Sequence, residues 1–367
     1  MKNKKLLILF LITIAVIITA GITARLRAPQ SNLEKEPLFP SLADQINNIS
    51  KVTIKGNKNT VVLLKQDNKW TVTNLDNYPA NFNKVRAAVI NLSLFKIVDE
   101  KTDNPDFYSR LGVDDPSSRN SSSLLITLFN NSNQELASVI IGRQRQSSSS
   151  KPGLYIRIPD QKQALLVEGG LEISANDIDW INRELMHIPS AQVKNITIQY
   201  PDGKVFEINK ETKDQPDFNI RGNSGEVPSA SKLIINRMAT GLEEMRADGV
   251  NSVNDFTFPE DSITTTVTTF TGMVVTVKLA QQSDHTYAHF SFSPVAEVPG
   301  EQYVRGEAGD GDTDTVNMEE LLQKLSAMSD WVYQIPDFKY EALTSDPESI
   351  KNLLQSRQPD ENPESDN

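Results

Sequence analysis

The amino-terminal segment is the most apolar part of the chain. Residues 6–24 form an uncharged run, LLILFLITIAVIITAGITA. A helix of that length is about 28 Å long at about 1.5 Å per residue, close to the thickness of the hydrocarbon core of a bilayer. The pattern predicts a transmembrane anchor over residues 1–27 and a tether over residues 28–48.

Basic residues flank this apolar run on both sides. Three lysines precede it and two arginines follow it, and this bias favours an amino terminus inside. We therefore expect a single-pass protein of the inner (cytoplasmic) membrane, with its body in the periplasm or outside the cytoplasm. The alternative is a signal peptide cleaved after Ala24, although Ile22 is bulky for such a site and Arg25 is unusual after it.

Beyond the tether, apolar and polar residues alternate in short runs, as in half-buried strands. The first runs place apolar residues at Val52 and Ile54, Val62 and Leu64, and Trp70 and Val72. A helix opened by Pro79 follows, because Phe82, Val85, Val89 and Leu92 form one stripe at helical spacing. Further strands are predicted over residues 124–129, 136–141, 154–158 and 164–167.

The same order of elements then recurs, which indicates a tandem repeat. Six matches occur in order: Val52 with Ile196, Val62 with Phe206, Trp70 with Phe218, Pro79 with Pro228, Phe107 with Phe256, and Trp180 with Trp331. The second helix, opened by Pro228, has apolar residues at Ile235, Met238, Leu242 and Met245. Its later strands are predicted over residues 263–270, 274–279 and 287–292.

Short polar turns between strands favour antiparallel pairing, because parallel pairing needs long crossovers. One helix in each repeat must cover one face of its sheet. We therefore predict an α+β protein in which a transmembrane helix precedes two tandem repeated lobes, residues 49–188 and 189–336. Each lobe is expected to be a mainly antiparallel sheet with one covering helix. Residues 337–367 are rich in Pro, Glu, Asp and Ser, and predict an acidic, disordered tail.

The charge balance narrows the possible partners. The formal net charge is −11, and without the five basic residues of the anchor it falls to −16. Phosphate backbones need cationic partners, so nucleic acid is not an expected ligand. The chain has no cysteine, which excludes disulfides, thiol nucleophiles and cysteine-ligated metals.

Two patterns have residue types that can bind metals. His285 and His289 fall in a run with strand-like alternation, which would separate them by roughly 13 Å at about 3.3 Å per residue. A solvated strand face is therefore favoured over a zinc site. Residues 310–314, DGDTD, resemble the start of a calcium loop. An EF-hand would need Gly and Glu where Thr315 and Leu321 stand, so an acidic surface loop is favoured.

Catalytic patterns are weaker still. Ser148 and Lys151 match Ser-x-x-Lys, but they lie in a serine run before Pro152 that is typical of a flexible loop. No phosphate-binding glycine loop occurs, and nothing singles out a carboxylate pair for glycoside hydrolysis. The three tryptophans could stack on sugars, although the match of Trp180 with Trp331 favours a structural role. We predict no catalytic, cofactor-binding or metal-binding residue.

Several of these segments together resemble one family. In order they are LFPSL at residues 38–42, KWTV at 69–72, YPA at 78–80, LGVDDP at 111–116 and DWINREL at 179–185. Over roughly residues 38–335 the chain is similar to the bacterial family known as domain of unknown function 4340. The second repeat departs from the pattern, since Phe218 replaces the tryptophan. The resemblance implies an envelope protein encoded beside a gliding-motility-type ABC transporter.

These observations favour a non-enzymatic, membrane-anchored envelope protein, an accessory or interaction subunit of an ABC-type transport system. Its expected partner is the permease or the auxiliary subunit, recognised through a basic exposed face. A module that binds an extracytoplasmic polysaccharide or peptidoglycan is the alternative. A hydrolase that acts through carboxylates is a third, less favoured, reading.

Overall fold

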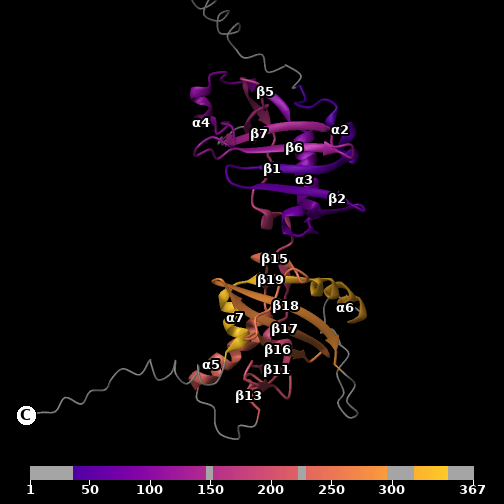
Figure 1. Cartoon of the computed structure of the whole chain (residues 1–367), viewed down its shortest axis with the longest axis vertical. Coiled ribbons are helices and arrows are strands. Elements are labelled where there is room, and N and C mark those ends of the chain that lie inside the picture. The colour runs from indigo at the N-terminus through magenta and orange to yellow at the C-terminus, as the bar shows by residue number, and fades with distance from the viewer. Residues whose placement is uncertain (1–35, 146–151, 222–228, 296–317, 346–367) are drawn as a thin grey trace, which may run out of the picture.

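The computed structural model of the chain describes residues 36–145, 152–221, 229–295 and 318–345. It contains two large antiparallel sheets, which lie one above the other in Figure 1, and one two-stranded sheet. The first large sheet and the elements packed on it are called the first lobe below, and the second large sheet with its elements is called the second lobe.

The first sheet has nine strands. Their order across the sheet is β4 (Tyr78–Pro79), β3 (Lys69–Val72), β2 (Thr60–Gln66), β1 (Ile49–Lys55), β6 (Leu124–Asn130), β7 (Glu135–Arg145), β8 (Gly153–Arg157), β9 (Ala164–Glu168) and β5 (Lys96–Glu100). Each neighbouring pair is antiparallel, as short connections between strands require.

The second sheet has eight strands. Their order is β13 (Asn219–Ile220), β12 (Val205–Asn209), β11 (Val193–Gln199), β16 (Ile263–Thr269), β17 (Met273–Gln282), β18 (His285–Pro294), β19 (Trp331–Ile335) and β15 (Gly249–Ser252). The small sheet pairs β10 (Glu184–Met186) with β14 (Met245–Arg246).

The helices within the described ranges are short. The α-helices are α2 (Leu42–Gln45), α3 (Phe82–Ser93), α4 (Tyr108–Leu111), α5 (Ser229–Met238), α6 (Met318–Ser326) and α7 (Asp337–Thr344). Single 3₁₀ turns are η1 (Ile46–Asn48), η2 (Thr73–Leu75), η3 (Pro105–Phe107), η4 (Asp177–Trp180), η5 (Ser190–Gln192), η6 (Ala239–Leu242) and η7 (Ala327–Asp330).

The two large sheets have the same order of counterpart strands. The series β3-β2-β1-β6-β7-β8-β9-β5 in the first corresponds to β13-β12-β11-β16-β17-β18-β19-β15 in the second. A register irregularity between Ile49 and Lys51 of β1 recurs between Val193 and Asn195 of β11. Bulges bend and twist a strand locally, so a shared bulge gives β1 and β11 the same local shape.

One predicted pairing of the repeat is wrong by one residue. The register makes Val61, and not Val62, the counterpart of Phe206. Val61 and Leu63 are fully buried, whereas Val62 and Leu64 are half-buried. The turn between β1 and β2 is one residue shorter than the turn between β11 and β12. Because strand side chains alternate between faces, that single residue exchanges the inner and outer sets.

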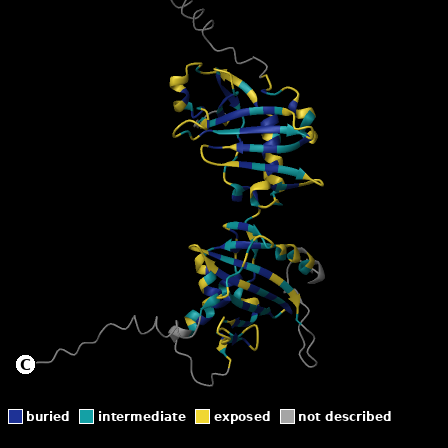
Figure 2. Cartoon of the chain, viewed as in Figure 1, coloured by how far each residue is buried: buried dark blue, intermediate teal, exposed yellow. Residues whose placement is uncertain are grey.

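The predicted helix of the first lobe starts later than expected. Helix α3 begins at Phe82, after Asn81, whose side chain accepts a hydrogen bond from the Lys84 amide at 3.2 Å. Val85 and its neighbours on the inner face of α3 are buried, but Phe82 is 56% exposed and is not part of the core. Buried residues gather between α3 and the sheet (Figure 2). The expected start of the second helix at Pro228 lies outside the described residues.

The predicted α+β class with a transmembrane helix has to be corrected. The described residues form mainly antiparallel sheet, and α3, with 12 residues, is the longest helix among them. One covering helix per lobe is wrong for the second lobe, where α6 and α7 accompany α5. The segment 6–24 lies outside the described residues, and no helix in the described ranges is long and apolar enough to span a bilayer. The architecture with that helix is therefore not supported.

The predicted tether extends too far along the chain. The Leu38 amide donates to the Phe95 carbonyl at 2.8 Å, and Leu38 and Leu42 are buried in the core of the first lobe. Residues 36–48 therefore pack against the first lobe, because two apolar side chains there are removed from water.

The predicted disordered tail begins too early, since α7 occupies Asp337–Thr344. Leu343 is buried, and its carbonyl accepts a hydrogen bond from the Thr265 hydroxyl at 2.6 Å. The Lys339 ammonium donates to the Thr240 carbonyl at 2.8 Å and to the Glu243 carbonyl. Burial lowers the pKa of Lys339. These contacts are made with distant parts of the chain, so the local composition of α7 does not predict them.

Candidate functional site

Helix α4 packs on the outer face of the first sheet, away from α3. Tyr108, Val113, Ile140 and Ala164 form a small buried cluster there, separate from the main core. Gly112 ends α4 in the left-handed region, with φ of 69°. A side chain at Gly142 of β7 would lie 2.5 Å from the Leu111 carbonyl oxygen. The glycine therefore lets the end of α4 touch β7.

A second glycine makes room for an arginine on the neighbouring strands. The register of β7 and β8 is irregular between Ile141 and Gln144, and it brings Arg145 opposite Gly153. A side chain at Gly153 would lie 3.3 Å from Nε of Arg145. Irregular pairing re-aims side chains at the end of a strand, and here it acts beside α4.

These elements enclose a hollow of about 610 Å³ on the first lobe. We call it the arginine hollow. Its lining residues are Arg110 of α4, Arg143, Gln144 and Arg145 of β7, and Tyr155 of β8. Arginines whose positions are far apart in the sequence thus meet at one place, although the sequence pattern did not single them out. The one local signal is the alternation of Arg143 and Arg145 on a single strand.

Two arginines of the hollow, Arg110 and Arg143, are exposed. Within the described residues, no ion pair or hydrogen bond joins Arg110 or Arg143 to an acidic side chain. The guanidinium of Arg110 lies over the ring of Phe107, 4.7 Å from its centre. Asp115, in the same connection as α4, accepts hydrogen bonds from Ser117 instead, and these lower the pKa of Asp115.

Arg157 shows what a structural arginine looks like on the same sheet face. It is 8% exposed, and its Nε donates to the Val113 carbonyl at 3.0 Å. A second nitrogen donates to the Gln161 carbonyl at 3.2 Å, and the guanidinium stacks on Tyr108. Buried guanidinium groups need such partners. Arg110 and Arg143 differ from Arg157 because both are exposed.

The place on the second lobe that corresponds to the arginine hollow carries aromatic side chains instead of arginines. Tyr287 of β18 is the counterpart of Tyr155, and its ring lies 4.8 Å from the ring of Phe256. Phe258 lies 4.9 Å from Phe256 and 6.4 Å from His289, under the ammonium of Lys278. We call these five residues the aromatic patch. Its rings are half-buried, so each keeps some contact with water.

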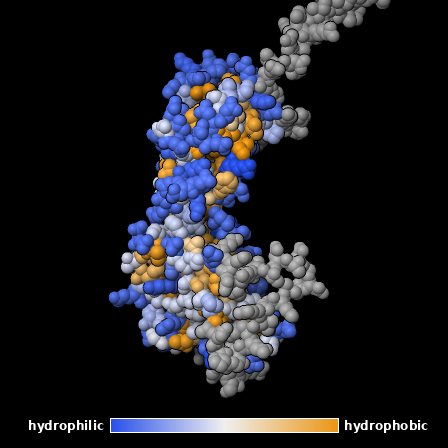
Figure 3. All heavy atoms as spheres, turned by 90° about the vertical axis from the view of Figure 1, so that its right-hand side faces the viewer, coloured by the Kyte–Doolittle hydropathy of each residue, from blue (hydrophilic) through white to orange (hydrophobic). Residues whose placement is uncertain are grey.

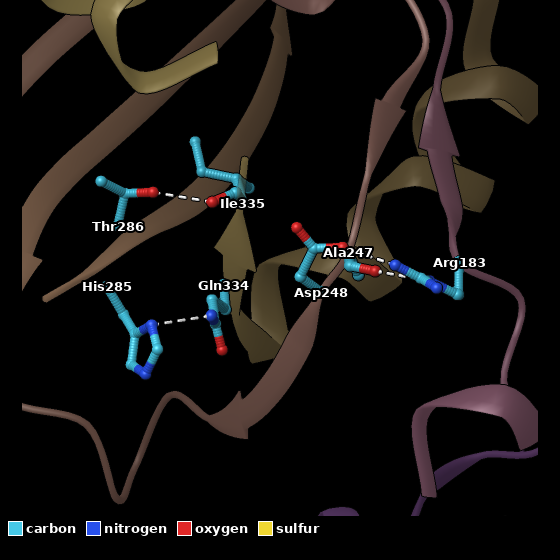
Figure 4. A network of polar contacts seen from close by, with 7 residues as sticks. All are labelled: Arg183, Ala247, Asp248, His285, Thr286, Gln334 and Ile335. Atoms are coloured by element: carbon cyan, nitrogen blue, oxygen red, sulfur yellow. Dashed lines mark hydrogen bonds and ion pairs between the residues drawn. The ribbon is translucent and has the colours of Figure 1, made fainter. Parts of the chain in front are cut away.

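The linker between the lobes, residues 169–192, is held by polar contacts (Figure 4). Nε of Arg183 donates to the Ala247 carbonyl at 3.0 Å, and a terminal nitrogen of Arg183 pairs with Asp248 at 2.5 Å. Further along the second sheet, the Gln334 amide contacts Nδ1 of His285 at 3.0 Å. The Asp248 amide donates to the Gln334 carbonyl at 2.8 Å, so these contacts form one chain.

Aromatic residues join the lobes directly. The ring of Tyr78 in β4 lies 4.8 Å from the ring of Trp331 in β19, edge to face. The Tyr78 hydroxyl lies 3.5 Å from the Tyr333 hydroxyl. Burial raises the pKa of both tyrosines. The Ser252 amide also donates to Asp76 at 3.0 Å, so the junction combines packing with hydrogen bonds.

The junction corrects the predicted match of Trp180 with Trp331. Trp331 begins β19, whose counterpart in the first sheet is β9, whereas Trp180 follows β9 in η4. Trp180 is buried, and its indole nitrogen donates to the Ser174 carbonyl at 2.9 Å. The two residues are therefore not counterparts, and Trp331 serves the contact between the lobes.

Glu243 supports a prediction about stability in acid. Its carboxylate accepts a hydrogen bond from the Ser190 amide at 2.6 Å. Burial raises the pKa of Glu243, but the hydrogen bonds from Ser190 and the charges of Lys339 and His187 together leave the pKa lowered. A lowered carboxyl pKa stabilises the fold above the pKa of the unfolded chain, and this contribution is lost as the pH falls through the folded pKa.

The variant Glu243→Gln cannot ionise, so it should lack this acid-dependent contribution. We expect the difference in the free energy of unfolding between wild type and variant to be largest near neutral pH and to shrink below about pH 4.3. Urea unfolding at pH 7, 5, 4 and 3 measures it. A difference that is constant across this range would contradict the prediction.

The residues weighed for metal chemistry fall on a strand. His285 and His289 lie on β18, where His289 contacts the Ser329 carbonyl at 2.8 Å and His285 contacts Gln334. The part of the chain that the structure describes contains no group of three or more His, Asp or Glu residues able to hold a metal ion. Residues 310–314 and the pair Ser148 and Lys151 lie outside it.

A single carboxylate attracts notice near another hollow. Asp177 of η4 has one buried oxygen without a hydrogen-bond partner, and burial raises the pKa of Asp177. The hollow beside Asn176, of about 270 Å³, is lined by residues 56–59, 121–124 and 175–176, and Asp177 is not among them. General acid–base hydrolysis needs a second carboxyl group, and Asp177 is not accompanied by one among the lining residues.

Comparison with known proteins gives one result at the level of the family. No curated protein and no solved structure matches the chain. The family described as "Domain of unknown function (DUF4340)" matches residues 70–262. This range contains the arginine hollow, the linker and four strands of the second sheet, namely β11, β12, β13 and β15. Since the match extends over more than half of the sequence, the protein belongs to the DUF4340 family.

Proposed function

We propose that the protein is a non-enzymatic accessory protein that binds an acidic group of its partner in the arginine hollow. The observation that carries this proposal is the position of Arg110 and Arg143, exposed and without a carboxylate partner within the described residues. Guanidinium groups form paired hydrogen bonds with carboxylates and phosphates, which gives both affinity and orientation.

The overall charge of the chain makes the arginine hollow selective. The chain carries 48 acidic and 37 basic residues, so most of its surface disfavours an acidic group. Hydrophilic residues dominate the face of the first lobe seen in Figure 3. An acidic ligand is therefore directed toward the hollow by attraction there and repulsion elsewhere.

The proposed partner is the permease or the auxiliary subunit of an ABC-type transport system. The family resemblance supports this class of partner, since related envelope proteins are encoded beside such transporters. On this proposal the body lies outside the cytoplasm at the inner membrane. A basic patch on the partner could still meet the acidic surface of the chain, and salt should weaken both contacts.

Co-purification tests the proposal. The full-length protein is co-expressed with the tagged permease and auxiliary subunit and purified at low salt. We expect the wild type to be retained and Arg143→Gln to be retained about tenfold less, as loss of a charge-assisted pair predicts. Arg86→Gln, which removes one exposed arginine from α3, is the matched control and should behave as wild type.

Two results would contradict the proposal. One is equal retention of wild type and Arg143→Gln on the transporter subunits. The other is a hydrolytic rate of the purified protein on an envelope polymer that disappears when one carboxylate, such as Asp177, is replaced. The second result would favour the hydrolase interpretation.

Binding of an envelope polysaccharide or peptidoglycan is the second candidate, and the aromatic patch favours it. Phe256, Phe258 and Tyr287 offer ring surfaces of the kind on which sugar rings stack, with Lys278 and His289 as neighbouring hydrogen-bonding groups. Sedimentation of the protein with insoluble peptidoglycan, compared with a Phe258→Ser variant, distinguishes this candidate from the first.

A further inference from the structure

We infer that the arginine hollow selects a doubly charged phosphate group over a carboxylate. This inference rests on the proposed function, because it names the acidic group that the hollow holds. Two exposed arginines, Arg110 and Arg143, line one small space.

A carboxylate and a phosphate differ in charge. A carboxylate carries one negative charge, and one arginine in paired geometry satisfies both of its oxygens. A phosphate ester carries up to two charges near neutral pH and has three strong acceptor oxygens. With a carboxylate in the hollow, the charges of Arg110 and Arg143 would be only half balanced. A phosphate dianion balances both.

The hydrogen-bond donors of the hollow come from two different elements of the fold. Arg110 comes from α4, and Arg143 from β7, so their guanidinium groups approach the hollow from different elements. A planar carboxylate offers its oxygens in one plane, whereas a tetrahedral phosphate presents oxygens in several directions. Tyr155 and Gln144 also line the hollow, and their side chains carry a hydroxyl and an amide, groups that can donate hydrogen bonds to phosphate oxygens.

Neighbouring groups restrict Arg110 and Arg143. Arg143 lies beside Gly112, where a side chain would come within 3.0 Å of Cγ of Arg143. Arg110 is held over the ring of Phe107, and α4 is fixed on β7 through Gly142. Donors held in place before binding lose less conformational freedom when a ligand arrives. The hollow thus offers guanidinium groups that neighbouring groups already restrict, and no lysine is among its lining residues.

The test compares two ligands that share a ring. Phenyl phosphate and benzoate are titrated into the full-length protein at pH 7.5 and low salt, with binding followed by calorimetry. We expect phenyl phosphate to bind at least about tenfold more tightly than benzoate, because an added charge-assisted hydrogen bond contributes about that factor. Below a pH of about 6 the phosphate loses its second charge. Its affinity should then fall toward that of benzoate.

Substitutions test whether phenyl phosphate binds in the arginine hollow. Arg143→Gln should weaken the binding of phenyl phosphate about tenfold or more, and Arg143→Lys should be intermediate because it keeps the charge and loses the paired geometry. Arg86→Gln on α3 is the control and should bind within about twofold of wild type. Circular dichroism and the urea midpoint of each variant verify that it folds.

Vesicles distinguish the source of the phosphate. The protein is sedimented with vesicles of phosphatidylcholine alone and with vesicles that also contain phosphatidic acid. Sedimentation that depends on phosphatidic acid and on Arg143 supports a lipid headgroup as the source. Binding of phenyl phosphate without sedimentation supports a soluble or protein-borne phosphate. Both results support phosphate selection, but a lipid headgroup as the source would overturn the assignment of the acidic group to a transporter subunit.

The outcomes separate this inference from the proposed function. If benzoate binds as tightly as phenyl phosphate, and Arg143→Gln weakens both, phosphate selection is overturned while binding of an acidic group stands. If neither ligand binds, or if Arg143→Gln changes neither, both the inference and the assignment of the hollow are overturned.

Discussion

Replacement of Tyr333 by alanine is expected to lower the free energy of unfolding by about 3 to 5 kcal/mol, the range for truncating a large buried ring. Tyr333 is fully buried in β19, between the core of the second lobe and the junction with the first. Its ring lies 5.9 Å from Phe290 and 6.2 Å from Tyr78. Truncation removes buried apolar surface and leaves a cavity at the base of the junction. Urea unfolding of the full-length protein measures the loss.

Tyr333→Phe is the matched control, because it keeps the ring and removes only the hydroxyl. That hydroxyl lies 3.5 Å from the hydroxyl of Tyr78, a long contact, so its loss should cost about 1 kcal/mol or less. The raised pKa of Tyr333 adds a spectroscopic check, since this residue should not ionise with the exposed tyrosines in an alkaline titration. An alanine variant as stable as the phenylalanine variant would contradict the packing argument.

Replacement of Gly142 by alanine should both destabilise the first lobe and weaken ligand binding in the arginine hollow. The new methyl group would lie 2.5 Å from the Leu111 carbonyl oxygen and 2.7 Å from Val113. Forcing extra volume into a packed contact costs about 1 to 3 kcal/mol. Helix α4 must move away from β7 to relieve it, and Arg110 moves with the helix. Urea unfolding and titration with phenyl phosphate measure the two effects.

Gly170→Ala is the control for this variant. A side chain at Gly170 would have no heavy atom within 4 Å, so the added methyl group meets open space. We expect its stability to change by less than about 0.5 kcal/mol and its phenyl phosphate affinity to match wild type. If Gly142→Ala behaved like Gly170→Ala, the close approach of α4 to β7 would not be a determinant of the hollow.

Alternation of side chains accounts for the strands that could be predicted. The expected strands over residues 124–129 and 136–141 appear as β6 and β7, because each run has several apolar residues that one face of a sheet can bury. The short strands β4, β10 and β14 have only two or three residues and no alternation to detect. Strands β10 and β14 pair with each other from distant parts of the chain, so a tertiary contact defines them, whereas β4 pairs with the nearby strand β3.

Among the helices too, local sequence predicts some and distant contacts decide others. The stripe of Val85, Val89 and Leu92 predicted α3, but its start depended on the cap at Asn81 and not on Pro79. Helix α7 has no comparable stripe, and the composition of this part of the chain predicts a disordered tail instead. Its burial depends on the Lys339 ammonium meeting carbonyls of residues 240 and 243, about a hundred positions earlier in the chain.

The sequence shows that familiar catalytic motifs are missing, but it does not show where the arginine hollow lies. Between Arg110 and Arg143 lie a connection that includes Gly112, the strand β6 and the first part of β7. They line the same space only because Gly142 lets α4 approach β7 and because the register of β7 and β8 is irregular. Neither an irregular register nor a close backbone approach leaves a pattern in hydrophobic periodicity.

The sequence alone determined the antiparallel strand-rich character of the chain, its acidic charge and its membership of a family, because these follow from local alternation, composition and short motifs. The tertiary structure decided which residues of a repeat correspond, which tryptophan joins the lobes and which arginines share a hollow. A single extra residue in the turn between β11 and β12 exchanged the inner and outer residues of the match. Contacts of this kind depend on the register and approach of whole elements, and a side chain's neighbours across a sheet are set by that register.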